Sequence, residues 1–132
     1  AEWPDPRLII LVLHNNDLNQ VTWEMRVMEG DPKYEASQNL PDINYAAYAE
    51  LCGLKGIRIE KPEQIVDAWE AAFSADRPVV IDALCDPSVP PLPPHTSWKQ
   101  SEAMLASLLK GDPDAGDIIR QSFKGLMKGL IH

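Results

Sequence analysis

The residues with the clearest potential for chemistry are the polar residues that follow the first apolar run of the chain. Residues 8–13 form that run, and Asn15, Asn16 and Asp17 follow it after His14. Six consecutive apolar residues are typical of a strand buried on both faces of a parallel sheet. Ligands bind at the carboxyl edge of such sheets. The amide and carboxylate groups could therefore bind a polar ligand, or they could only make a turn and cap the next helix.

Apolar spacing and turn residues predict the elements that position this turn. Two further strands are expected over 56–60 and 78–84. Helices are expected over 21–28, from an N-cap at Asp42 to Cys52, and from Pro62 to Phe73. Because strands alternate with helices, the strands should pair in parallel. We therefore predict an α/β fold, a partial doubly wound parallel sheet with three recognisable strands flanked by helices. The stretch 30–41 has no clear period and is predicted to be a mobile loop.

The composition changes after Asp86 and predicts a different organisation for the end of the chain. Residues 87–97 are rich in proline and should form an extended connector, which could pack on the domain surface or bind a proline-recognising module. A helical tail is expected over 98–132, and its residues 117–131 form a basic amphipathic pattern. That pattern suits peripheral contact with a membrane, or packing against protein. Residues 1–86 precede the connector as one domain.

Bulk properties exclude several classes of protein. The net charge of −8 argues against nucleic acid, because phosphate binding needs clustered Lys and Arg. No run approaches the roughly 20 apolar residues of a membrane span. The two cysteines, Cys52 and Cys85, lie in a helical pattern and at a strand end, which favours reduced thiols and a cytoplasmic location.

The order of the motifs resembles a known enzyme family. The strings that carry the resemblance are VLHNNDLNQVTWEMR and AELCGLKGIRIEKPEQIVDAWEAAFSADRPVVIDALCD, followed by the proline-rich exit. Together they resemble the carboxyl-terminal, pyrophosphate-binding part of thiamine-diphosphate-dependent enzymes. The pyruvate oxidase and pyruvate:quinone oxidoreductase group is the most similar, with acetolactate synthase close behind. The family's Gly-Asp-Gly motif does not occur in this chain, so we expect a fragment whose first part lies upstream.

The resemblance implies roles for the residues around the Asn pair. In the family, Mg²⁺ binds the cofactor diphosphate through oxygen ligands, which by position would include the Asn16 amide and the Leu18 backbone carbonyl. Asn15 would hold the turn or contact the diphosphate. Trp23 and Glu24 lie where the family places substrate-side residues, but a core Trp and a solvated Glu are the alternative. The family's catalytic Glu belongs to a second domain outside this chain, the catalytic residues of this chain are otherwise unknown, and His14 should pack at the sheet edge.

The resemblance also implies a function for the parent protein. We expect an enzyme that uses thiamine diphosphate and Mg²⁺ to decarboxylate a 2-oxo acid such as pyruvate, with oxidation or carboligation. An acetolactate-synthase-like carboligase and a simple decarboxylase are the alternatives, and a non-catalytic flavodoxin-like module is a third. FAD, if used, would be bound mainly by other domains. The parent should be a homo-oligomer, in the cytoplasm or peripherally at the inner membrane, and this piece alone should be inactive.

Overall fold

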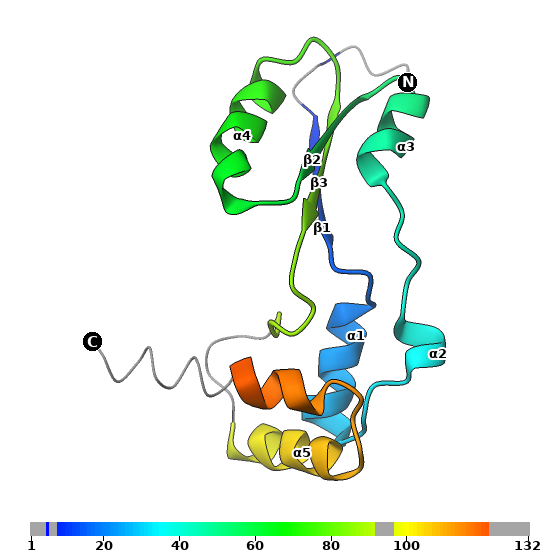
Figure 1. Ribbon diagram of the computed structural model, residues 1–132, viewed down its shortest axis with the longest axis vertical. Helices are drawn as coiled ribbons and strands as arrows, with labels where there is room; N and C mark the ends of the chain where they lie inside the picture. The colour runs from blue at the N-terminus through cyan, green and yellow to red at the C-terminus, as the bar shows by residue number, and fades with distance from the viewer. Residues whose placement is uncertain (1–4, 6–7, 92–96, 122–132) are drawn as a thin grey trace, which may run out of the picture. The chain divides into compact units, whose positions relative to one another are not determined.

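The computed structural model describes residues 5, 8–91 and 97–121, and these form two compact units (Figure 1). The first, the sheet unit, contains the described residues up to Asn15 together with 41–85. The second, the helical unit, contains residues 16–40 and the described residues from Asp86 onward. The chain therefore passes between the two units at the Asn pair.

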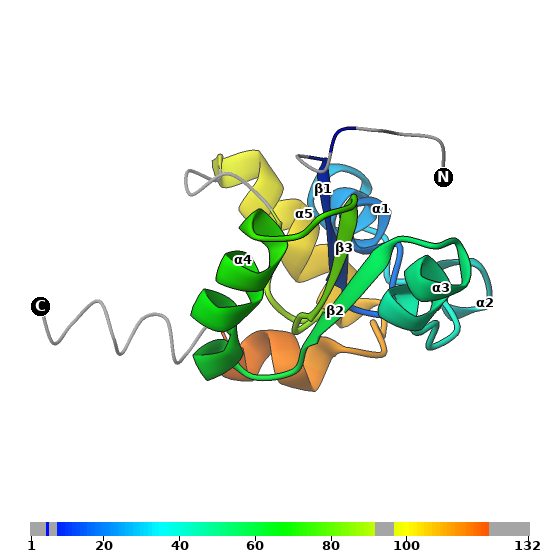
Figure 2. The ribbon, with the colours of Figure 1, turned by 90° about the horizontal axis from the view of Figure 1, so that it is seen from above.

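The sheet unit is a three-stranded parallel sheet with a helix on each face. Its strands are β1 (Ile9–His14), β2 (Lys55–Ile59) and β3 (Val79–Leu84), in the order β1-β3-β2. Both pairings are parallel, with Ile9 and Lys55 each in register with Val79. Helix α3 (Tyr45–Leu51) lies on one face, and α4 (Ile65–Phe73), which follows the 3-10 turn η2 (Pro62–Gln64), lies on the other (Figures 1 and 2). The predicted α/β fold class and parallel pairing are confirmed.

The core of the sheet unit lies between the sheet and α4. Val79 and Ile81 of the central strand are fully buried there. They pack with side chains of β2 and α4, namely Ile59, Ala68 and Ala72. The small residues on α4 allow the helix to approach the β-branched residues of the sheet closely, and burial of these apolar surfaces stabilises the unit.

The first strand differs from its prediction of burial on both faces. Ile10 and Leu11 are each 44% exposed and Leu13 is 66% exposed. The reason is the strand order, because β1 is an edge strand of the described sheet and β3 takes the central position. The first four residues of β3 are all buried, so the pattern expected of β1 is found in β3 instead.

The start of α3 also differs from its prediction. Asn44, and not Asp42, is the N-cap, since its side-chain oxygen accepts a hydrogen bond of 2.8 Å from the Ala47 amide. Asp42 lies two residues too early to reach the first free amides of the helix. The predicted end is correct, because Gly53 follows the helix with φ of +76°.

The helical unit is built on the segment that follows the Asn pair. Helix α1 (Asn19–Glu24) continues into a π-helical turn, η1 (Met25–Glu29), which ends at Gly30 with φ of +68°. Helix α5 (Trp98–Leu109) packs against η1 and starts at the N-cap Ser97, while residues 115–121 are also helical. Among the described residues of this unit, the buried apolar side chains come from three different segments: Trp23, Val27 and Ile118.

The stretch 30–41 was predicted to be a loop without secondary structure, but it contains regular backbone hydrogen bonds. It contains the short helix α2 (Glu35–Gln38), and Asn39 forms an isolated antiparallel bridge with Asp17. A single turn of helix gives no detectable period in a sequence, which explains why the pattern did not show it. The mobility of this stretch stays a prediction.

The described part of the proline-rich connector is attached to α1. The Pro87 carbonyl accepts hydrogen bonds from the Trp23 indole N–H, at 3.2 Å, and from the Asn19 side-chain amide, at 2.9 Å. This anchoring supports the interpretation of a connector that packs on the protein surface. Residues 92–96, and most of the amphipathic pattern over 117–131, lie outside the described residues.

A close contact between α3 and β2 gives a test of the sheet unit. A Cβ atom at Gly56 would overlap with the backbone carbonyl of Ala46. Gly56→Ala should therefore lower the free energy of unfolding by about 1–3 kcal/mol, as expected of overpacking. Gly116 is helical and has open space around it. Gly116→Ala should be neutral or stabilise by up to about 1 kcal/mol. Thermal unfolding followed by circular dichroism would measure both, and equal midpoints would contradict the packing argument.

Candidate cofactor site

The turn after β1 is held in a defined shape by backbone hydrogen bonds. Asn16 has φ of +55°, a left-handed conformation that Asn adopts more readily than most residues. Its carbonyl accepts a 2.8 Å hydrogen bond from the Leu40 amide, and the Leu18 amide donates one of 2.8 Å to the Gln38 carbonyl. The Leu18 carbonyl accepts the first hydrogen bond of α1 from Thr22, at 2.9 Å. The predicted turn before a helix is correct, but the predicted capping by Asn or Asp is wrong, because Leu18 is the N-cap of α1 and no side chain caps it.

The side chain of Asp17 points into the helical unit and is 3% exposed. Its carboxylate accepts hydrogen bonds from the Thr22 hydroxyl, at 3.0 Å, and from the Asn19 amide, at 3.3 Å. The Lys33 ammonium lies 3.2 Å from the same carboxylate. A buried carboxylate needs such donors, because an unpaired charge in the interior is unfavourable. Asp17 thus acts within the protein interior, between two residues whose oxygens are candidates for ligand binding.

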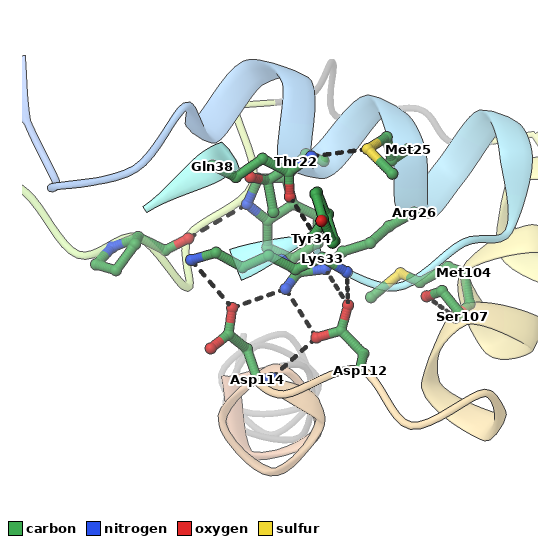
Figure 3. Close-up of polar contacts among 12 residues, drawn as sticks. Thr22, Met25, Arg26, Lys33, Tyr34, Gln38, Met104, Ser107, Asp112 and Asp114 are labelled. Atoms are coloured by element: carbon green, nitrogen blue, oxygen red, sulfur yellow. Dashed lines mark hydrogen bonds and ion pairs between the residues drawn. The ribbon is translucent and has the colours of Figure 1, made fainter. Parts of the chain in front are cut away.

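A second buried ion pair lies in the helical unit, around Arg26 (Figure 3). Arg26 is 1% exposed, and its guanidinium donates two hydrogen bonds of 2.8 Å to Asp112 and one of 2.7 Å to Asp114. Asp112 also accepts hydrogen bonds from the backbone amides of Lys33 and Asp114, each at 2.9 Å. The guanidinium lies 4.9 Å from the centre of the Trp23 ring. These contacts connect η1, the segment after Gly30 and the end of α5.

The same contacts shift the pKa of both partners toward the charged state. Burial by itself raises the pKa of Asp112, but the hydrogen bonds from Arg26 and from two backbone amides outweigh it, so the pKa lies below its ordinary value. Burial lowers the pKa of Arg26, and the hydrogen bonds and charges of Asp112 and Asp114 outweigh that effect and raise it. Both groups are therefore ionised at neutral pH.

His14 belongs to a buried polar cluster in the sheet unit. It is 3% exposed, its Nδ1 lies 2.7 Å from the Asp82 carboxylate, and its ring packs edge-on against Tyr45. Asp82 is fully buried and also accepts hydrogen bonds from Arg58, at 2.9 Å, and from the Tyr45 amide, at 3.1 Å. The expected position of His14 at the sheet edge is confirmed, and the ring is oriented by a carboxylate.

The two substrate-side candidates lie in different surroundings. Trp23 is 1% exposed and hydrogen-bonded to Pro87, so it forms part of the core of the helical unit. Glu24 is exposed and accepts a hydrogen bond of 2.9 Å from Gln20. Glu24 also lines a groove on α1 and η1, with Val21, Met25 and Met28 among its neighbours. The packing of Trp23 matches the core alternative, and a role of Glu24 toward substrate stays a prediction.

The oxygens of the turn are of the chemical type that Mg²⁺ takes as ligands when it binds a diphosphate. The Asn16 side chain offers an amide oxygen, and the Leu18 carbonyl retains a second lone pair beside its helical hydrogen bond. Both of these oxygen ligands are neutral, and the Asp17 carboxylate, which lies between them in the sequence, is turned inward. Within the described residues there is no group of three acidic, His or Cys side chains that could hold a metal alone. In chemical type the two oxygens suit Mg²⁺, which needs more oxygen ligands than these two.

Comparison with known proteins identifies the fold family. Residues 5–83 match the family described as thiamine pyrophosphate enzyme, C-terminal TPP binding domain. This chain belongs to that family. The match covers β1, β2, all of β3 except its last residue, the turn at the Asn pair and the helices between them. The motifs had indicated the same family.

Two relatives from Bacillus subtilis (strain 168) support the assignment. The thiamine pyrophosphate-containing protein YdaP is 33% identical over 124 residues, which is 94% of this chain and 21% of YdaP. An acetolactate synthase is 32% identical over 70 residues, which is 52% of this chain and 12% of the synthase. The chain thus spans about a fifth or less of the length of these relatives.

Several of the buried polar residues described above were not singled out from the sequence. Asp82 could have been found, because a carboxylate inside the apolar run VVIDAL implies a buried partner. Arg26 and Asp112 are separated by 86 positions, and nothing in the local pattern of either residue indicates the other.

Both cysteines, Cys52 and Cys85, are free thiols as expected. None of the described helices is long and apolar enough to cross a membrane.

The Arg26–Asp112 pair predicts a pH dependence of stability. Asp112→Asn should lower the free energy of unfolding by about 3–5 kcal/mol at neutral pH, because it leaves a buried guanidinium with an incomplete set of acceptors. Since the folded pKa of Asp112 is lowered, its contribution is complete above the unfolded value and decreases as the pH falls through the folded one. The difference between variant and original protein should therefore shrink below about pH 4.

Asp31→Asn is the matched control, because Asp31 pairs with Lys110 in an exposed contact of 2.7 Å. It should change stability by less than about 1 kcal/mol. Urea unfolding at pH 7 and pH 3 would measure both variants. A difference for Asp112→Asn that stays constant between these pH values would contradict the assignment of the charged pair.

Proposed function

We propose that this chain contributes part of the Mg²⁺–diphosphate site of an enzyme that acts on a 2-oxo acid such as pyruvate. The observation that carries the proposal is the turn after β1. Two neutral oxygens, from the Asn16 side chain and the Leu18 carbonyl, follow a strand at the carboxyl edge of a parallel sheet. The membership of a thiamine pyrophosphate-binding family gives these oxygens a ligand of the right chemistry.

In this proposal each residue of the turn has a separate task. The Asn16 amide and the Leu18 carbonyl coordinate Mg²⁺ without adding negative charge near a diphosphate. Asn15 holds the turn or donates a hydrogen bond to the diphosphate. When bound, the cofactor supplies the electron sink that decarboxylation of a 2-oxo acid requires. The chain itself binds and orients, and the groups that complete the reaction lie in other parts of the parent.

The reaction type has three candidates. The identity with an acetolactate synthase supports carboligation, and the resemblance of the motifs to pyruvate oxidases supports oxidation. A simple decarboxylase remains the third alternative. The parent assayed on pyruvate, with flavin content, acetolactate and acetaldehyde measured together, would distinguish them. Bound FAD without acetolactate would favour the oxidase, and acetolactate as the main product would favour the carboligase.

Assembly as a homo-oligomer, and lipid contact through residues 117–131, belong to the same proposal.

The metal assignment gives a direct prediction. In the parent enzyme, Asn16→Ala should weaken Mg²⁺-dependent binding of thiamine diphosphate by about 10-fold or more, because it removes one ligand oxygen. Asn15→Ala should weaken binding much less. Isothermal titration calorimetry of the apoenzyme, with and without Mg²⁺, would measure the affinities.

Asn16→Gly separates the ligand from the backbone. Gly accepts the left-handed conformation of residue 16 without strain, so this variant removes the amide and leaves the turn intact. It should weaken Mg²⁺-dependent binding as Asn16→Ala does. If Asn16→Gly binds the cofactor as the original protein does, the side chain is not a ligand and the assignment is wrong.

A further inference from the structure

Asp17 stands between the two proposed ligand residues but is turned away from them. Its side chain is 3% exposed and is held inside the helical unit by Thr22, Asn19 and Lys33. A carboxylate beside a metal–diphosphate would add negative charge, whereas a carboxylate fixed in the interior leaves the Leu18 carbonyl and the Asn16 amide as the oxygens of the turn. The direction of this one side chain therefore decides which groups the turn can offer.

Lys33 supplies the positive charge that holds Asp17 in this direction. Its ammonium is 3.2 Å from Asp17 and 3.8 Å from Asp114, and its side chain is only 9% exposed. A long ammonium side chain loses much conformational freedom when it is buried, so this geometry requires the pairing to compensate. Removal of Lys33 would take away the ammonium group that lies 3.2 Å from the buried Asp17 carboxylate.

The position of Lys33 depends in turn on the buried Arg26 pair (Figure 3). The backbone amide of Lys33 donates a 2.9 Å hydrogen bond to Asp112, which Arg26 holds with two hydrogen bonds of 2.8 Å. Residues 112 and 114 thus fix the backbone and the side chain of residue 33. The contacts run without interruption from the end of α5 to the turn, entirely within the helical unit.

We propose that Asp17 and Lys33 are positioning residues for Mg²⁺, and that the 112–114 segment supports them. This inference rests on the proposed function, since it assumes that Asn16 and Leu18 are ligands. Asp17 and Lys33 do not contact the metal. Their ion pair keeps the backbone of residues 16–18 in the conformation that presents the two oxygens, and it keeps a carboxylate out of the first coordination shell.

The test is the Mg²⁺ concentration that gives half-maximal binding of thiamine diphosphate to the full-length apoenzyme, followed by tryptophan fluorescence. Lys33→Met should raise this concentration by about 10-fold or more, the range found when groups that orient metal ligands are removed. Lys33→Arg keeps the cation and should stay within about threefold of the original protein. The melting temperature of every variant is measured in parallel.

Lys110→Met is the matched control. It removes one Lys from an exposed ion pair with Asp31 in the same unit, where Lys110 is the C-cap of α5. It should leave the half-saturating Mg²⁺ concentration unchanged. The double variant Asp17→Asn with Lys33→Met removes both charges, and the Asn oxygen can still accept from Thr22. It should recover at least part of the Mg²⁺ affinity lost in Lys33→Met, and if Lys33→Met does not fold, Asp17→Asn replaces it with an expected rise in the same direction.

A purely structural role of the ion pair predicts a different result. The melting temperature of Lys33→Met would fall while the half-saturating Mg²⁺ concentration stayed at the original value, and this outcome overturns the inference. Asn16→Ala, measured in the same titration, distinguishes the two levels of the proposal. If Asn16→Ala shifts the Mg²⁺ dependence and Lys33→Met does not, only the positioning role fails. If neither shifts it, the proposed function fails as well.

Discussion

Arg26 and Asp82 are ionisable side chains that are 1% and 0% exposed, and the arrangement of each compact unit depends on the partners that surround them. A buried charge without a partner is unfavourable by several kcal/mol, so the residues around it must supply hydrogen-bond donors or acceptors in fixed directions. For Arg26 these come from Asp112 and Asp114, on a segment that follows α5. For Asp82 they come from His14 and Arg58 on the neighbouring strands, and from the backbone amide that opens α3.

These two clusters connect the core of each unit to the turn that carries the candidate ligands. Asp82 orients His14, the residue directly before the Asn pair, at the end of an edge strand. In the helical unit, Lys33 joins the Arg26 cluster to Asp17, directly after the pair. One end of the turn is therefore attached to the buried Asp82 carboxylate through His14, and the other end to the Lys33 ammonium through Asp17. These contacts give a physical reason for the turn to keep its shape.

The helical unit shows how segments distant in sequence serve one site. The proline-rich segment begins at a carbonyl held by Trp23 and Asn19, and α5 packs on the π-helical turn η1. Gly30, whose positive φ ends that turn, also lies against α5, where a Cβ would come within 3.2 Å of the Ala103 carbonyl. The segment after residue 86 is therefore a structural part of the unit that carries the proposed ligands, and it does more than connect or terminate the chain.

The sequence by itself determined the class of fold, the parallel pairing of the strands and the turn at the Asn pair, because these depend on local patterns. The run of six apolar residues, the polar turn after it and the apolar stripe on α4 can each be recognised within a window of about ten residues. Most helix boundaries followed from the same kind of signal, such as Gly53 after α3. The tertiary structure decided which strand is central, so that β3 and not β1 is buried on both faces. It also decided the partners of Arg26 and Asp17, because ion pairs between residues up to 86 positions apart have no local signature.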